Sequence, residues 1–326
     1  GNALDANTSG QNNTALGKET LGACTSGGNN TAVGTAALLA ATADNNNVAV
    51  GHIALTSNNG GESNVAVGAS ALQNNSTADN NTAVGKSALA ANTSGSQNVA
   101  VGKEAGLAVT TGSKNVVVGS EALYANTSGD QNVAIGYNSL FANTTADNNT
   151  ALGHGTLQSN TTGTQNIAVG GRALDANTTA NNNVAIGHDS LTDNTTGANN
   201  VAVGTNSLAN NTTADNNAAV GYKALEGNTT GTRNTAVGGF ALQVSSTANN
   251  NTAVGYGVLL SNTTGTDNTA VGKNALDSNT TASFNTAIGS EALAVNTTGG
   301  GNTAVGFETL AANTTASNQT AYGFRA

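Results

Sequence analysis

Asn13-Thr14-Ala15-Leu16-Gly17 is the first copy of a pentapeptide, often Asn-Thr-Ala-Val-Gly, that returns every 17 residues to the end of the chain. Its glycine recurs at Gly34 and Gly51 and then without interruption to Gly323, which places 19 glycines in one register. A fixed period is the signature of a repeat protein in which each unit packs only against its neighbours. The sequence therefore predicts a solenoid.

The composition limits both the core and the partners. The chain has 326 residues with 42 Gly, five Tyr and five Phe, and it has no Pro, Met or Trp, so Ala, Val and Leu must supply a narrow core. Its net charge of −9 argues against nucleic acid or an anionic membrane surface, because both attract clustered Lys and Arg. No apolar run of about 18 residues is present, so we expect no membrane insertion. Cys24 is the single cysteine, which excludes an intrachain disulfide.

We number the positions of a repeat from its recurrent glycine, which is position 0. Asn occupies position −4 in every repeat but the last, Ala occupies −2 except at Val117, and Val, Ile or Leu occupies −1 except at Tyr322. This β-branched segment between turn formers predicts a short strand, and identical strands stacked repeat upon repeat give parallel in-register ladders. The Asn column predicts a ladder in which each amide donates to the next. Its representative members are Asn98, Asn132, Asn166, Asn200 and Asn234.

The rest of the repeat is less decisive. Ala and Leu at +3 and +4 break strict alternation, so positions +1 to +6 are open between a second, bent strand and a single helical turn. The expected fold is all-β, a parallel β-solenoid or β-roll of 19 coils with a 17-residue repeat and with one helical turn per coil as an alternative. We expect residues 1–326 to form a single continuous solenoid domain that is part of a longer chain or fibre, because terminal coils present unpaired strand edges.

Which face of the strand points inward is also open. If Ala at −2 points into the coil, alternation sends the Val at −1 outward. A stripe of exposed apolar residues would result, which an oligomer would bury. If the Val points inward, no apolar stripe is exposed and the protein could be a monomer. The small Ala beside the large Val favours the first orientation.

Three stretches carry a family resemblance. Val133-Ala134-Ile135-Gly136, Val184-Ala185-Ile186-Gly187 and Ala83-Val84-Gly85-Lys86-Ser87-Ala88 resemble the head repeats of the YadA-like trimeric autotransporter adhesins. Tail-fibre proteins of bacteriophages contain similar repeats. The resemblance implies a left-handed parallel β-roll, three identical chains around an axis and attachment to surfaces such as extracellular matrix. The adhesin repeats are usually shorter and lack the Asn-Thr-Thr segment found here.

No catalytic or metal-binding constellation recurs. His52, His154 and His188 all follow the glycine at +1, but no second and third ligands appear at matching positions. We therefore expect no enzyme activity, no metal and no cofactor. Any ligand specificity is expected at +1 and +2, where the sequence varies most. The aromatic residues of these columns include Tyr137, Tyr222, Phe240, Tyr256 and Phe307.

In fourteen coils, position +7 carries Asn followed two residues later by Thr or Ser, which matches the N-glycosylation acceptor. Stacked coils lie about 4.8 Å apart, so glycans on adjacent coils would crowd one another. The favoured alternative is a turn with Asn caps and ladders of Thr hydroxyls. The candidate acceptors are Asn92, Asn126, Asn143, Asn160, Asn177, Asn194, Asn211, Asn228, Asn262, Asn279, Asn296 and Asn313.

These features together predict a structural or adhesive segment of an extracellular, cell-surface fibre. Its expected partners are copies of itself, as a homo-oligomer such as a trimer or as an end-to-end filament, and a host-surface or matrix ligand. A bacteriophage tail-fibre shaft is one alternative. An ice-binding β-solenoid is another, because flat Thr-rich faces order water, although Thr14 and Thr31 share their column with Val48 and Val65.

Overall fold

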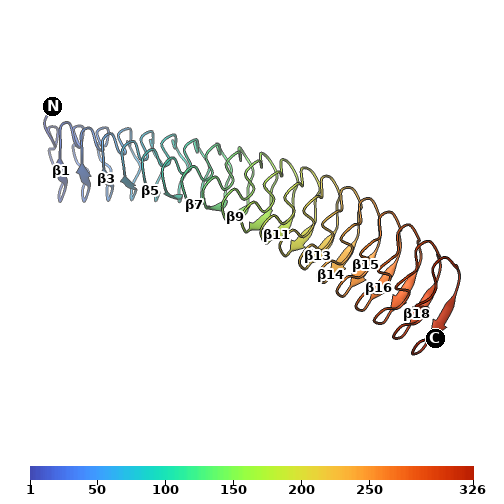
Figure 1. Ribbon diagram of the computed structural model, residues 1–326. Helices are drawn as coiled ribbons and strands as arrows, with labels where there is room; N and C mark the ends of the chain where they lie inside the picture. The colour runs from blue at the N-terminus through green and yellow to red at the C-terminus, as the bar shows by residue number, and fades with distance from the viewer. The chain divides into compact units, whose positions relative to one another are not determined.

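The computed structural model describes residues 1–326 as an all-β protein with 19 strands of three residues each and no helix. The chain divides into two units, residues 1–165 and 166–326. Each unit is a parallel β-solenoid with one strand in every 17-residue coil (Figure 1). The predicted fold class is confirmed. No helix is present that could cross a membrane.

The strands occupy positions −3 to −1 of the repeat. The first unit contains β1 (Thr14–Leu16), β2 (Thr31–Val33), β3 (Val48–Val50), β4 (Val65–Val67), β5 (Thr82–Val84), β6 (Val99–Val101), β7 (Val116–Val118), β8 (Val133–Ile135) and β9 (Thr150–Leu152). The second unit contains β10 (Ile167–Val169), β11 (Val184–Ile186), β12 (Val201–Val203), β13 (Ala218–Val220), β14 (Thr235–Val237), β15 (Thr252–Val254), β16 (Thr269–Val271), β17 (Thr286–Ile288), β18 (Thr303–Val305) and β19 (Thr320–Tyr322).

Within each unit, every strand pairs with its successor in parallel and in register. Val184 of β11, for example, lies beside Val201 of β12. The Ala at −2 points into the coil, and Ala100 is 0% exposed while its neighbour Val101 is 38% exposed. The orientation with Ala inside and the larger residue outside is therefore confirmed.

The segment from +1 to +6 contains no helical turn, so that alternative is wrong. The Leu residues at +4 have φ between 48° and 54°, and residues at +2 are also left-handed, as Glu104 is with φ of 57°. A right-handed helix cannot continue through such alternating residues. Left-handed backbone costs about 1–2 kcal/mol per residue. Burial of the Leu side chain, worth about 1.5–3 kcal/mol, offsets that cost.

The glycine at position 0 has two reasons to be glycine. Gly204 has φ of 131°, a region that L residues rarely enter. A Cβ built on it would lie 2.6 Å from the carbonyl oxygen of Gly221 in the next coil. Each coil thus stacks directly on the backbone of its neighbour at this corner.

The predicted Asn ladder at −4 is present, but its bonding differs from the expectation. Asn200 accepts the backbone N–H of Asn217 on Oδ1 at 2.9 Å, and its Nδ2 donates to the carbonyl of Ala214 at 2.8 Å. The amide therefore bonds mainly to the backbone of the next coil and so links the two coils. The same Nδ2 bond to a backbone carbonyl is made by Asn98, Asn132, Asn166 and Asn234.

A second ladder runs through the Asn residues at +7, and here one amide does donate to another. Asn92 donates from Nδ2 to Oδ1 of Asn75 at 2.8 Å and to the carbonyl of Gly95 at 2.9 Å. The corresponding side chains are buried. In a dry interior such a fully bonded amide column stabilises the stack, because an unpaired amide there is costly.

Where +7 lacks Asn, the ladder is either repaired or interrupted. Ala41 cannot accept the bond of Asn58, and Asp44 substitutes, accepting from Asn58 Nδ2 at 2.8 Å and from the N–H of Gly60 at 2.8 Å. Burial raises the pKa of this carboxyl, against the lowering effect of those two hydrogen bonds. Cys24 also occupies the column, and burial raises the pKa of its thiol.

Two interruptions are not repaired. Val109 follows Asn92 and Ser245 follows Asn228 in the column, and the Oδ1 atoms of both Asn residues have no hydrogen-bond partner. The buried hydroxyl of Ser245 is also unpaired. These coils therefore bear the free-energy penalty of unpaired buried polar atoms, which the rest of the ladder avoids.

Ser245→Asn is expected to stabilise the protein by about 1–3 kcal/mol, because the new Nδ2 would supply the missing donor for Asn228 and remove an unpaired hydroxyl. Chemical denaturation followed by circular dichroism measures the change. Ser261→Asn is the matched control, since it adds the same group at +6, where Asn210 stands naturally; its effect should stay within about 0.5 kcal/mol. Equal shifts for the two variants would contradict the ladder explanation.

Candidate functional site

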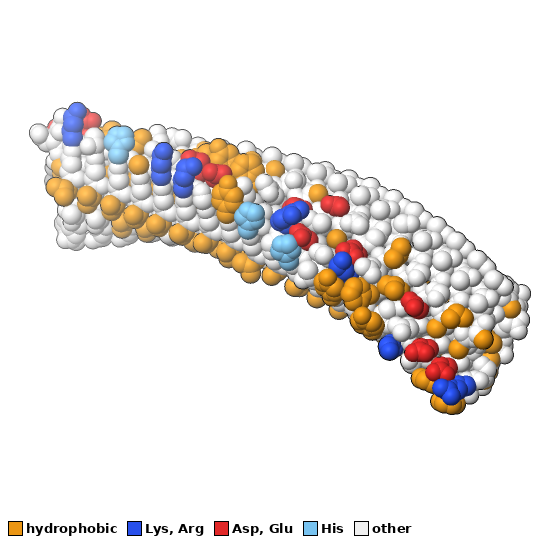
Figure 2. All heavy atoms as spheres, in the orientation of Figure 1, with side chains coloured by type: hydrophobic (Ala, Val, Ile, Leu, Met, Phe, Trp, Pro, Cys, Tyr) orange, Lys and Arg blue, Asp and Glu red, His pale blue; other side chains and the backbone are white.

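Side chains at +1, +2 and +5 form the variable face of the coils. Contacts join these columns: Lys223 at +2 lies 3.2 Å from Glu226 at +5, and the rings of Phe240 at +2 and Tyr256 at +1 of the next coil are 5.6 Å apart. Figure 2 shows charged side chains of both signs interspersed with apolar ones on this face. This face therefore holds the candidate residues for any function that depends on sequence differences between coils.

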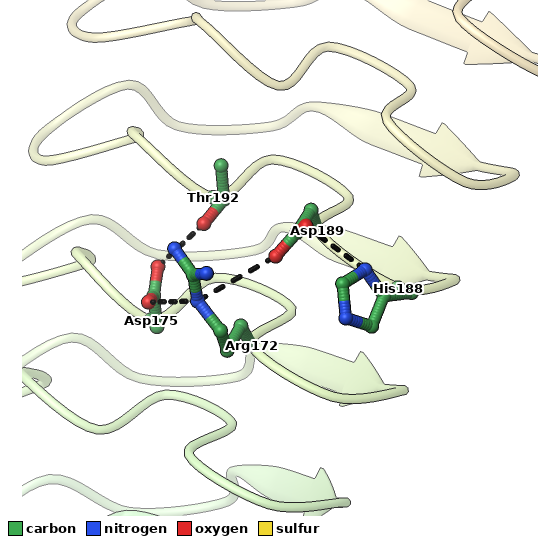
Figure 3. Close-up of polar contacts among 5 residues, drawn as sticks. All are labelled: Arg172, Asp175, His188, Asp189 and Thr192. Carbon is green, nitrogen blue, oxygen red and sulfur yellow. Dashed lines mark hydrogen bonds and ion pairs between the residues drawn. The ribbon is translucent and has the colours of Figure 1, made fainter.

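A charged cluster on this face joins two successive coils (Figure 3). Arg172 Nε lies 3.3 Å from Asp175 Oδ2 and 3.6 Å from Asp189 Oδ1. His188 Nδ1 lies 2.9 Å from Asp189 Oδ2, and the Thr192 hydroxyl donates to Asp175 Oδ1 at 2.6 Å. One basic residue thus bridges two carboxylates that belong to different coils.

The chemistry of this cluster is charge compensation. The hydrogen bond to Asp175, followed by the charge of Asp189, raises the pKa of the Arg172 guanidinium. Thr192 is bonded to Asp175 and not to His188, so the cluster does not pair a hydroxyl nucleophile with a base. Arg172 is 55% and His188 61% exposed, and ion pairs this exposed contribute about 0–1 kcal/mol each.

The three histidines do not belong to a group of side chains that could hold a metal ion. His154 stacks on Tyr137, with ring centroids 5.7 Å apart, and His188 faces Asp189. No group of three or more His, Cys, Asp or Glu side chains is arranged to hold a metal ion. The +1 column is thus a line of surface side chains that contact their nearest neighbours.

Three of the aromatic residues singled out in the sequence meet in the second unit. Tyr222 and Phe240 have ring centroids 5.3 Å apart, and Phe240 and Tyr256 are 5.6 Å apart, both edge to face. Phe307 stacks instead on Phe324 at 5.3 Å. A shallow hollow lies over Gly257, beside Phe240 and Tyr256.

The candidate glycosylation column lies inside the coil. Of the twelve Asn residues, all but Asn313 are 0% exposed, and their Nδ2 atoms face the neighbouring coil and the turn carbonyl. A glycan on Nδ2 cannot be accommodated in these folded coils. The turn alternative describes the geometry, because the Thr at +8 also donates its hydroxyl to the next coil, as Thr212 does to the carbonyl of Thr229 at 3.1 Å.

The paired threonines divide between two environments. Thr212 at +8 is committed to the ladder, and Thr213 at +9 is exposed. Each such coil therefore exposes one Thr side chain at this turn. This agrees with the expectation that two adjacent Thr residues cannot both face the same way.

The outer face of the strands forms a second continuous surface, which we name the strand-face stripe: the side chains at −3 and −1 within each unit. Figure 2 shows hydrophobic side chains along the edge where Figure 1 draws the strands. Many of the apolar residues at −1 keep 36–44% of their surface exposed. They include Val84, Val101, Val118, Leu152, Ile186, Val220, Val237, Val254 and Ile288.

No known protein family matches the chain, and no curated protein matches its sequence. Two elements of the variable face were not expected from the sequence, namely the carboxylates at +5 and the hollow over Gly257. The acidic residues of the +5 column, Asp175, Glu226 and Asp277, are the signal that would have drawn attention to it.

Proposed function

We propose that the chain is a non-catalytic structural segment of an extracellular fibre and that it assembles with copies of itself through the strand-face stripe. The observation that supports this assembly is the row of half-exposed Val, Ile and Leu side chains at −1. Soluble monomers rarely present a continuous apolar surface of this kind. Burying a Val or Ile completely contributes about 1.5–3 kcal/mol, and the stripe repeats its partial gain in every coil.

A second copy is the occupant that fits the stripe best. The residues at −1 recur once per coil, with one in-register strand in each. Only a partner whose apolar residues repeat at the same spacing can match the stripe over many coils. A second copy of the chain has this spacing. Closed symmetry about an axis along the stripe gives a homo-oligomer such as a trimer, whereas a staggered overlap of chains along the stripe gives a filament.

The two classes of fibre whose repeats resemble this chain, an adhesin segment and a bacteriophage tail-fibre shaft, are both compatible with such an assembly. In the adhesive case, the variable face at +1, +2 and +5 supplies contacts to a host-surface or matrix ligand. That face is the part of the coil where side chains differ most from one repeat to the next.

The assembly is tested with the triple variant Ile186→Lys, Val220→Lys and Val254→Lys. We expect the unmodified protein to sediment as an oligomer and the variant as a monomer, because lysines on an outward strand face leave the fold intact while blocking apolar contact. Sedimentation equilibrium measures the mass against the 31.6 kDa of one chain.

The matched control places three lysines on exposed threonines at +9, with Thr196→Lys, Thr213→Lys and Thr230→Lys, and should remain an oligomer. A monomeric unmodified protein, or an oligomer that survives the stripe substitutions, would refute the proposal. Electron microscopy of the unmodified protein then separates filaments of continuous length from discrete particles.

A further inference from the structure

The hollow over Gly257 arises because this coil lacks a side chain at +2. Phe240 and Asn274 occupy the same column in the coils before and after, and Tyr256 borders the hollow at +1. Asp277 lines it from the +5 column. Its volume of about 300 Å³ is at the lower end of the range for ligand sites, which suits a small group.

Asp277 gives the hollow an uncompensated negative charge. Its carboxylate makes no hydrogen bond or ion pair with the protein, and no Lys or Arg lines the hollow. Burial raises the pKa of Asp277, with no partner opposing the shift. A half-buried carboxylate without a counter-charge favours a cationic ligand, because pairing relieves the cost of lost hydration.

The aromatic walls point to the same chemistry. Elsewhere in this unit, two exposed rings lie beside cations of the chain itself: Lys223 Nζ is 5.7 Å from the centre of Tyr222, and the Arg325 guanidinium carbon is 5.1 Å from that of Phe324. Phe240 and Tyr256 have no such cation. Aromatic faces beside a carboxylate form the usual environment for an organic ammonium ion.

We propose that the hollow bounded by Phe240, Tyr256 and Asp277 binds an alkylammonium group, delivered as a free methylated amine or as a lysine side chain of a partner protein. The rings contact the alkyl part, and the Asp277 carboxylate pairs with the charge. This binding activity is independent of the strand-face stripe, which lies on other columns of the coil.

The test uses ligand-observed NMR titration of the full chain with two matched pairs of probes. Choline is compared with 3,3-dimethylbutan-1-ol, its neutral isostere, and N-acetyl-lysine methylamide with N-acetyl-norleucine methylamide. We expect at least one cation to bind about tenfold or more tightly than its neutral counterpart. Preference for choline identifies a free methylated amine as the source, and preference for the lysine derivative identifies a protein side chain.

Two variants assign the binding to the hollow. Asp277→Asn removes the charge with little change in shape, and Gly257→Asn fills the space with the residue that Asn274 provides in the next coil. Gly257 has φ of 63°, and Asn274 has φ of 54°, so the second variant keeps the backbone. Its Cβ would lie 2.8 Å from Asn274 Oδ1, so the end of the Asn274 side chain turns aside to admit it. Both are expected to weaken binding of the preferred cation about tenfold or more.

Asp267→Asn is the charge-matched control, because it removes one carboxylate from position +12, which lies outside the hollow, and leaves the hollow itself intact. It should bind the cation as the unmodified protein does. The proposal is overturned if neither cation binds, if the neutral isosteres bind equally well, or if Asp267→Asn weakens binding as much as Asp277→Asn.

Discussion

Gly204→Ala is expected to destabilise the second unit by about 2–6 kcal/mol. A strained backbone contributes about 1–3 kcal/mol, because φ is 131° at this residue. Overpacking contributes a further 1–3 kcal/mol or so, because the new Cβ would lie 2.6 Å from the carbonyl oxygen of Gly221. Since the carbonyl belongs to the backbone of the next coil, the stack must separate locally to admit the methyl group. Denaturant unfolding and amide hydrogen exchange measure the loss.

Gly171→Ala is the matched control for this substitution. Gly171 lies outside the left-handed region, and a Cβ added to it would have His188 Cδ2 as its nearest neighbour at 3.4 Å, an ordinary contact. Its effect should be small or slightly stabilising, because Ala restricts the unfolded chain. Comparable losses in both variants would show that the glycine column does not depend on its geometry.

Asn200→Leu is expected to cost about 2–4 kcal/mol. The substitution leaves the buried N–H of Asn217 without its acceptor, at about 1–3 kcal/mol, and removes the bond to the Ala214 carbonyl, at about 1 kcal/mol. Leu branches at Cγ as Asn does but is larger, so overpacking at this buried position adds to the loss of hydrogen bonds. The shift in the denaturation midpoint measures it.

Asn210→Leu makes the same exchange at the exposed +6 position, where Val244 and Val295 occur naturally. It should change stability by no more than about 0.5 kcal/mol. If Asn200→Leu were equally mild, the −4 column would not be the element that ties successive coils together.

Periodicity was sufficient to predict the strands, and residue size favoured the correct one of their two possible orientations. The invariant spacing of the glycine aligned the coils, and Ala between two larger residues indicated which side is buried, as Ala100 beside Val101 confirms. The solenoid of each unit follows directly, since each strand has one possible in-register neighbour on each side.

The connecting segment was not predictable from the same signals. Leu is a strong right-handed helix former, so nothing in the residue type announces φ near +50° at +4. The conformation is imposed by burial of the side chain in the coil. The +7 column was similarly ambiguous, because Asn143-Thr144-Thr145 is both a glycosylation motif and a stackable turn. Only the packing shows its amide to be buried and bonded.

The sequence predicted which positions form the variable face, but not which side chains meet there. Tyr222, Phe240 and Tyr256 were expected on this face, and they lie there. Their convergence depends on Gly239 and Gly257, which leave room for rings of adjacent coils to meet. A glycine does not by itself indicate a hollow in a sequence. The hollow becomes visible only when the positions of the side chains on neighbouring coils are known.

The interruptions of the +7 ladder at Val109 and Ser245 bear on how this protein responds to tension. Peeling one coil from the next along an intact ladder must break the amide bonds in addition to the backbone bonds. At these two coils the peeling front meets fewer bonds, so mechanical rupture starts or advances most easily there. In the proposed fibre, these coils are expected to be weak links that set the size of the pieces into which it frays.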